Sequence, residues 1–152
     1  MRPPALSIVR VAALLSLMCS GMAQATPDVT ASATAGASNL TMDGAGGSST
    51  HIVKVANLSL STDVSAGFTL SVSSGSLTKT GGTSVPFKVA LVADEAAPPA
   101  EGDFTVSSGS TLLHSTSSAG AENVDLYIKY QSATLQDPGP YSASISLNIV
   151  DN

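Results

Sequence analysis

The sequence lacks most of the residues that cross-link a small domain or carry its binding chemistry. It has no tryptophan, one cysteine and two arginines, and Cys19, Arg2 and Arg10 all precede residue 26. Residues 26–152 therefore cannot form an intrachain disulfide. A domain of this length without disulfides depends on strand pairing and on a hydrophobic core, which it is long enough to build.

Positive charge is scarce as well. Residues 26–152 contain four lysines and no arginine against 11 acidic residues, so their net charge is −7. Nucleic-acid binding takes most of its affinity from clusters of basic residues. We therefore expect no nucleic-acid partner.

The first 25 residues have the layout of a secretory signal peptide. Arg2 and Arg10 flank the start of an apolar run over 11–18, and Ala23 and Ala25 supply small residues at a cleavage site. We expect cleavage after Ala25, export through the periplasm, and a secreted or cell-surface location. The apolar run is too short for a permanent anchor, so no transmembrane segment is expected after cleavage.

Short alternating segments separated by Gly, Ser, Asp and Pro dominate the remaining chain and predict strands. A change of phase near Ala56 and Asn57 predicts a bulge or a crossing between sheets. The expected fold class is all-β, an antiparallel two-sheet Ig-like β-sandwich, with a barrel as the second choice. The expected organisation is a signal peptide over 1–25, an N-terminal extended segment over 26–37, and a β-sandwich domain over 38–152.

No motif predicts catalysis. Ser76-x-x-Lys79 and Lys79-Thr80-Gly81 occur in penicillin-binding serine enzymes, where the two motifs come from distant parts of a larger chain. Here they share one lysine in a turn, so they cannot converge on a substrate. We therefore expect that the protein is not an enzyme and has no catalytic residues.

The sequence also predicts no cofactor and no metal. His51 and His114 have no second histidine or cysteine at ligand spacing. The acidic residues around the Pro-rich loop 93–102 match no calcium-binding pattern. We interpret these side chains as solvated or locally hydrogen-bonded.

The last segment has the clearest strand pattern in the chain. Five residues of one parity alternate with serine and asparagine, which places them on one face of a strand: Tyr141, Ala143, Ile145, Leu147 and Ile149. A terminal segment so well patterned must be held by a neighbouring strand, in the same chain or in another one. The start of the mature chain alternates more weakly, with smaller residues: Val29, Ala31, Ala33 and Ala35.

Three stretches resemble fimbrial (pilus) subunits of the chaperone–usher kind, in particular the disulfide-free class of the class 5 fimbriae and the common pilus. DVTASATAG at 28–36 is similar to the N-terminal segment of those pilins. GFTLSVSSGSLTK followed by VPFKVAL resembles their central strands, and GPYSASISLNI at 139–149 is similar to their closing strand.

The resemblance implies a structural subunit that assembles by donor-strand addition. In that family the sandwich lacks its final strand, and the N-terminal segment of the next subunit fills the open groove. The implied donor residues are Val29, Ala31, Ala33 and Ala35, and Tyr141, Ala143, Ile145, Leu147 and Ile149 line the acceptor groove. The implied partners are copies of itself or related subunits, a periplasmic chaperone and an outer-membrane usher. An in-chain role for 28–36, as an ordinary edge strand, remains open.

Two other interpretations also remain open. One is a monomeric secreted binding module, an adhesin for carbohydrate or a surface partner, that uses the loops 93–102 and 115–122. Sugar sites usually stack a ring on an exposed aromatic, and only Tyr127 is predicted to face outward. The other is a spore-coat-like or biofilm-matrix protein of the same fold.

Overall fold

The computed structural model describes residues 26–42, 47–134, 136 and 140–152. The predicted signal peptide, residues 1–25, lies outside this part of the chain. No helix among the described residues is long and apolar enough to cross a membrane.

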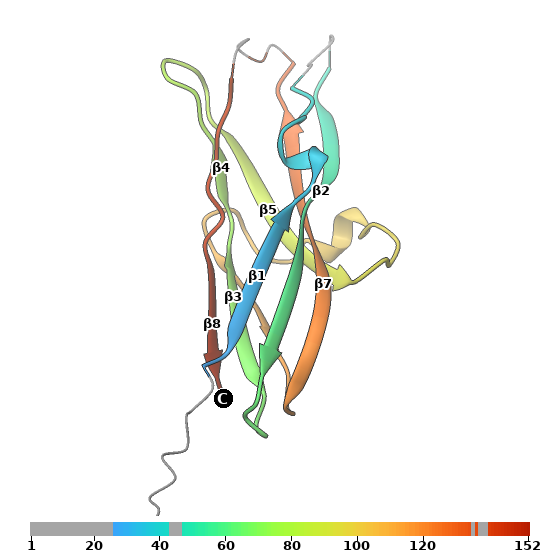
Figure 1. The fold of residues 1–152 in the computed structure, drawn as a ribbon. Helices are drawn as coiled ribbons and strands as arrows, with labels where there is room; N and C mark the ends of the chain where they lie inside the picture. Colours follow the sequence, from blue (N-terminus) through green and yellow to red (C-terminus); the bar gives the residue numbers. More distant parts are fainter. Residues whose placement is uncertain (1–25, 43–46, 135, 137–139) are drawn as a thin grey trace, which may run out of the picture.

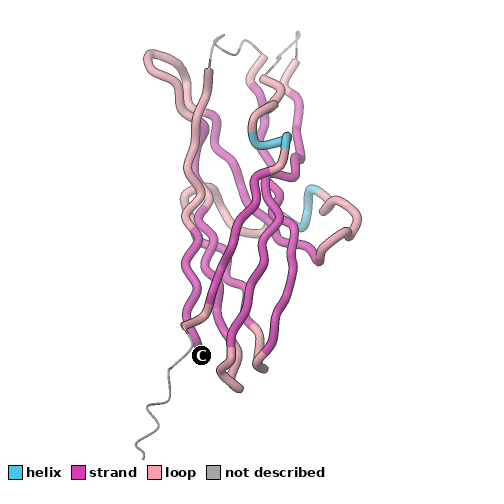
Figure 2. Tube along the Cα trace, in the orientation of Figure 1, coloured by secondary structure: helices cyan, strands magenta, loops and turns pink. Residues whose placement is uncertain are grey.

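Two antiparallel sheets make up the fold, so the all-β prediction is confirmed (Figure 1). The larger sheet has the strand order β1-β2-β7-β5-β4, with β1 Asp28–Ala33, β2 Ser49–Thr62, β7 Gly120–Ser132, β5 Val85–Ala93 and β4 Gly75–Leu77. The smaller sheet has the order β6-β3-β8, with β6 Thr111–Ser115, β3 Phe68–Ser73 and β8 Leu147–Asp151. Helical residues within the described ranges are confined to two 3-10 turns, η1 Ala35–Ala37 and η2 Glu101–Asp103 (Figure 2).

The main core lies between the two sheets. The smaller sheet contributes Phe68, Leu70 and Val72 of β3, while Leu58, Phe87 and Ile128 are among the residues that the larger sheet contributes. These side chains alternate along their strands with Ser, Thr, Lys and Asn, as the period of a strand requires. The alternation in the sequence therefore identified the buried face of each of these strands.

Strand β2 contains the irregularity that its change of phase predicted. Its register against β7 shifts between Lys54 and Ala56. The bulge lets Val55 and Leu58 both face the core, although they differ in parity.

An ion pair joins β2 to β7 beside the bulge. The ammonium of Lys54 in β2 lies 2.7 Å from the carboxylate of Asp125 in β7, and Asp125 is almost fully buried. The hydrogen bond to Asp125 raises the pKa of Lys54 above its ordinary value of 10.5.

A second, smaller cluster covers the outer face of the larger sheet. Phe104, from the loop after η2, packs there against Ala90 and Tyr127. Tyr127 does face away from the main core, as predicted, but only 7% of it is exposed. The sequence pattern predicted the face of the strand on which Tyr127 lies, but not the Phe104 loop that folds over it.

Candidate functional site

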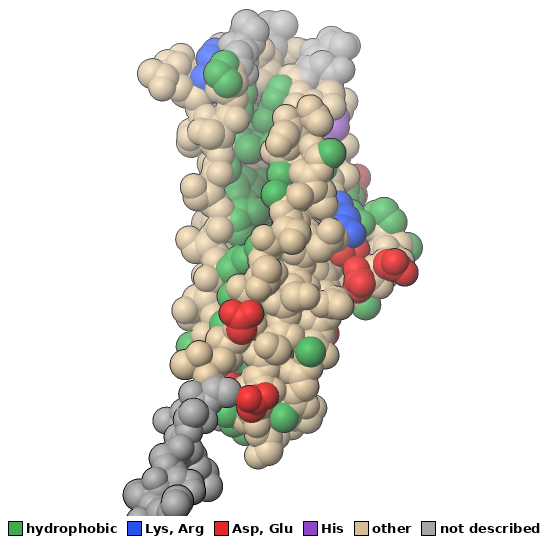
Figure 3. Space-filling model, in the orientation of Figure 1, with side chains coloured by type: hydrophobic (Ala, Val, Ile, Leu, Met, Phe, Trp, Pro, Cys, Tyr) green, Lys and Arg blue, Asp and Glu red, His purple; other side chains and the backbone are tan. Residues whose placement is uncertain are grey.

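An open apolar groove runs between the edges of the two sheets. Two adjoining hollows of about 280 and 290 Å³ share Ala37, Leu40 and Tyr141 in their linings. Figure 3 shows hydrophobic side chains gathered in a stripe along this hollow, between two ridges of polar surface. Val55, Leu77, Phe87 and Ile128 of the larger sheet also line the groove, so its floor is part of the main core.

The C-terminal segment forms the first wall. Tyr141, Ala143 and Ile145 line the groove, and Leu147 and Ile149 continue on the same face against the core. All but Ala143, which is exposed, are only partly buried, whereas Leu70 and Val72, the β3 partners of Ile149 and Leu147, are fully buried. The predicted wall is thus present as a row of apolar side chains that this chain covers incompletely.

The strand pattern of this wall is less regular than the sequence predicted. Regular pairing is limited to β8, and the segment from 141 to 146 is extended without ladder pairing except at Ser142 (Figure 2). Pairing is interrupted because the neighbouring chain, from β3 to β4, passes from one sheet to the other beside residues 141–146. Strand β3 belongs to the smaller sheet and β4 to the larger one. The prediction of a continuous strand is therefore wrong over 141–146, and residue 139 lies outside the described residues.

This wall makes backbone hydrogen bonds along one edge. Ser142 exchanges two with Thr78, at 2.8 and 2.9 Å, and the Ser146 carbonyl accepts one from Ser73 at 3.0 Å. Successive residues of an extended strand turn their backbone N–H and C=O groups to opposite edges. Since Ser142 and Ser146 turn theirs toward Thr78 and Ser73, Ala143 and Ile145 turn theirs toward the opposite edge. Within the described part of the chain neither of these two residues makes a backbone hydrogen bond. The groove thus has unpaired backbone groups as well as apolar side chains along this wall.

The second wall comes from the segment after β1. Thr34 donates its backbone N–H to the Val55 carbonyl at 2.9 Å and its hydroxyl to the Lys54 carbonyl at 2.5 Å, next to the bulge of β2. After Thr34 the chain turns into η1, where the Ala37 N–H donates to the Thr34 carbonyl at 3.1 Å. Leu40 and Met42 then line the groove opposite Tyr141.

Leu40 and Met42 were not predicted as site residues. Their alternation was the only available signal, and a local pattern does not reveal which wall a short segment faces. Gly36 shows how tightly the segment is seated, because a Cβ at this position would overlap the Lys54 carbonyl and lie 2.7 Å from Val53 Cγ1.

The predicted donor segment is paired within its own chain in this structure. All six residues of β1 pair with β2, from Asp28 opposite Ser61 to Ala33 opposite Ala56. Only Val29 is partly buried against the core, while Ala31 and Ala33 are exposed. Ala35 lies in η1 and not in the strand, so the predicted strand is shorter than its alternating pattern suggested.

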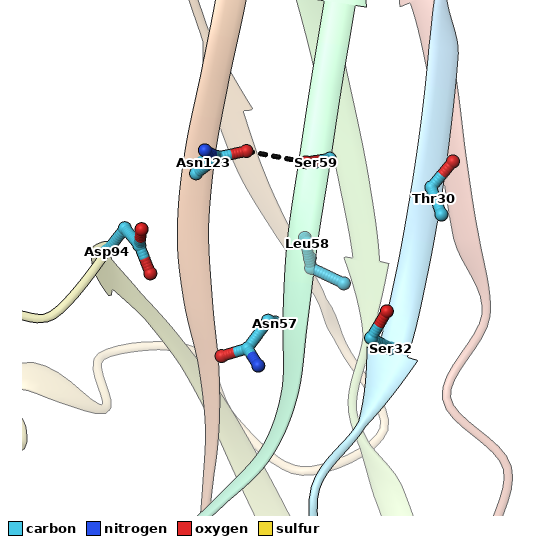
Figure 4. Close-up of a pocket in the computed structure, with 7 residues that line it drawn as sticks. All are labelled: Thr30, Ser32, Asn57, Leu58, Ser59, Asp94 and Asn123. Carbon is cyan, nitrogen blue, oxygen red and sulfur yellow. Dashed lines mark hydrogen bonds between the residues drawn. The ribbon is translucent and has the colours of Figure 1, made fainter.

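A separate hollow, of about 300 Å³, lies on the outer, polar face of the larger sheet. Hydroxyl, amide and carboxylate groups line it, including those of Thr30, Asn57 and Asp94 (Figure 4). Ser59 donates a hydrogen bond to Asn123 across it. No aromatic side chain is among its lining residues. Since Tyr127 is covered by the loop, neither this hollow nor Tyr127 offers an exposed aromatic ring on which a sugar could stack.

The two histidines are held by separate neighbours. His51 stacks on Tyr130, with ring centroids 5.1 Å apart, and His114 Nε2 lies 2.9 Å from Glu122. Among the described residues no group of three or more His, Cys, Asp or Glu side chains is placed to hold a metal ion.

Comparisons with known proteins do not assign this chain to a family. No family model, no curated protein and no solved structure matches it. The functional interpretation therefore rests on the groove and on the residues that line it.

Proposed function

We propose that this protein is a secreted structural subunit of a bacterial fimbria or surface fibre, and that its groove receives a strand from another copy. The observation that carries the proposal is the open groove, with partly buried apolar side chains along the wall formed by Tyr141, Ile145, Leu147 and Ile149. Backbone groups of Ala143 and Ile145 are unpaired along the same edge. An added strand would satisfy both, which is the mode known as β-strand addition.

The strand order supports an Ig-like sandwich with one position vacant. In the Ig constant-type fold, strands A, B, E and D form one sheet and strands C, F and G the other. Here β1, β2, β7 and β5 occur in the order A-B-E-D, and β3 and β8 take the places of C and F. No strand of the described chain lies beside β8 in the place of G, and this is the edge that the groove follows.

Filling the groove would complete the burial of its apolar wall. Full burial of a large apolar side chain contributes roughly 1.5–3 kcal/mol, so completing the burial of four side chains that are already partly buried contributes on the order of 2 kcal/mol. New backbone hydrogen bonds would add to this. Until it is filled, the groove is an exposed apolar edge that invites aggregation, and a chaperone in the periplasm and an usher would serve to protect it and fill it.

The donor in this proposal is β1 of the next subunit. Because β1 is paired with β2 of its own chain, donation requires it to leave that edge and enter a neighbour's groove. Its side chains are mostly exposed, so its release costs little hydrophobic burial and mainly breaks the pairing with β2. Val29 is then its main apolar anchor in the groove.

Two complementary variants test the proposal. Ile145→Asp places a charge in the groove and should abolish acceptance, and Val29→Asp should abolish donation, while each remains folded by circular dichroism. The mature wild-type chain, refolded at high concentration, should form a ladder of oligomers by light scattering, and each variant alone should stay monomeric. A mixture of the two variants should stop at a one-to-one dimer. Monomeric wild type under these conditions, or continued polymerisation of either variant, would refute assembly through β1 and the groove.

A further inference from the structure

Two lysines face each other on the outer side of the larger sheet, away from the groove. Lys88 of β5 lies directly opposite Lys129 of β7 in the ladder. Directly opposed residues have Cβ atoms about 4.5–5.5 Å apart on the same face, and like charges in such pairs destabilise a sheet. These are two of only four lysines in residues 26–152, where 11 residues are acidic. The chain thus places half of its mature positive charge in one unfavourable pair.

The protein neutralises this pair only in part. Lys129 donates to the Glu101 backbone carbonyl at 2.7 Å, and Lys88 donates to the Phe104 carbonyl at 3.4 Å. The Glu101 carboxylate is 4.0 Å from the Lys129 ammonium, and its side chain is 66% exposed. An ammonium has three donors, so both lysines retain N–H groups without a partner among the described residues.

Both lysines line one hollow of about 260 Å³, between the sheet and the loop that follows β5, which projects beside β7 (Figure 1). Besides the two lysines, the hollow is lined by neutral hydrogen-bonding residues, by one apolar ring and by one acidic residue: Thr50, Ser108, Tyr130, Gln131, Pro86 and Glu101. Clefts for drug-sized ligands measure roughly 300–1,000 Å³. This hollow therefore suits a smaller unit, with one anionic group and several hydroxyls.

We propose that the hollow between Lys88 and Lys129 binds a single acidic sugar unit, a carboxylated or sulfated monosaccharide of a surface glycan. Its anionic group takes the place between the two ammonium groups and relieves their repulsion through charge-assisted hydrogen bonds. Its hydroxyls meet Thr50, Ser108 and Gln131, and an apolar face of its ring packs on Pro86. The site is independent of fibre assembly, because none of these residues lines the groove.

The test is a titration of the monomeric Ile145→Asp protein followed by NMR amide shifts. Glucuronate and galactose 6-sulfate should produce saturable shifts at residues 86–88 and 129–131, at millimolar concentration, and glucose should not. Lys88→Met and Lys129→Met should each weaken binding about tenfold, as expected when one charge-assisted hydrogen bond is lost. Glu101→Gln should strengthen it, because a competing carboxylate is removed.

Lys79→Met is the matched control, since it removes the same charge outside the hollow and should leave binding unchanged. Equal shifts with glucose, no saturable shift with either acidic sugar, or equal weakening by Lys79→Met would overturn the proposal. Preferential binding of an acidic peptide such as a glutamate hexamer would overturn it too, since a peptide would then be the ligand.

Discussion

Thr78 and Ser142 join the two sheets through a pair of reciprocal backbone hydrogen bonds, at 2.8 and 2.9 Å. Thr78 follows β4 of the larger sheet, and Ser142 precedes β8 of the smaller one. This isolated bridge holds the wall of the groove at the point where regular pairing has stopped. The groove is therefore held in shape by a small number of backbone contacts.

Replacing Ser142 by proline should loosen this wall. Proline removes the N–H that bonds to the Thr78 carbonyl and leaves that carbonyl unpaired, so we expect a loss of about 1–3 kcal/mol in the free energy of unfolding. Urea denaturation measures the loss. Ala143→Pro is the matched control, because the Ala143 N–H makes no backbone hydrogen bond within the described residues. Equal destabilisation by both variants would show that the bridge is unimportant.

Ile145 and Leu70 should respond differently to truncation. Leu70 is fully buried, and Leu70→Ala should destabilise the monomer by about 2–5 kcal/mol. Ile145 is only partly buried, so Ile145→Ala should cost less than about 1.5 kcal/mol in the monomer. The cost of Ile145→Ala should then increase in the assembled fibre, measured by its resistance to urea. An unchanged cost in the fibre would mean that the groove stays empty there.

A disulfide between β1 and β2 should separate the two roles of β1. Thr30 and Ser59 are opposite each other in the ladder and exposed, so Thr30→Cys with Ser59→Cys brings two thiols within bonding range. The oxidised protein should be more stable by about 3 kcal/mol and unable to donate β1, while its groove still accepts β1 of an Ile145→Asp partner.

Reduction of that disulfide should restore assembly, which size-exclusion chromatography can follow. Thr30→Cys alone is the control and should assemble like the wild type. Normal fibre growth by the oxidised double variant would show that β1 remains paired in its own chain and that the donor is another segment.

The ion pair between Lys54 and Asp125 predicts a loss of stability at alkaline pH. The pKa of Lys54 is raised in the folded state by its hydrogen bond to Asp125, so its contribution is fully present below pH 10.5 and is lost as the pH rises through the higher folded pKa. The difference in unfolding free energy between wild type and Lys54→Met should be constant from pH 7 to about pH 10 and shrink above that. As a control, the difference in unfolding free energy between wild type and Lys79→Met should not change over this pH range. A difference between wild type and Lys54→Met that grows with pH would contradict the pairing of Lys54 with Asp125.

The sequence identified much of the groove but not all of it. Alternation alone placed Tyr141, Ile145, Leu147 and Ile149 on one apolar face, and the structure places all four against the core. It did not identify Leu40 and Met42 on the facing wall, because a two-residue pattern has no partner until the chain folds. Nor did it predict that β1 pairs with β2, since Ala31 and Ala33 fit a pairing within the chain and one between chains equally well.

What the sequence by itself determined is the all-β class and the inward faces of the strands β2, β3, β5 and β7, because the period of a strand is local and each side chain's face follows from its neighbours. The bulge near Ala56 belongs to the same category, since a change of phase is also local. Only the tertiary structure decided that Tyr127 is covered by Phe104, that Lys88 lies opposite Lys129, and that the edge beside Ile145 is open. Each of these depends on register and on contacts between segments far apart in the chain, which a local pattern does not encode.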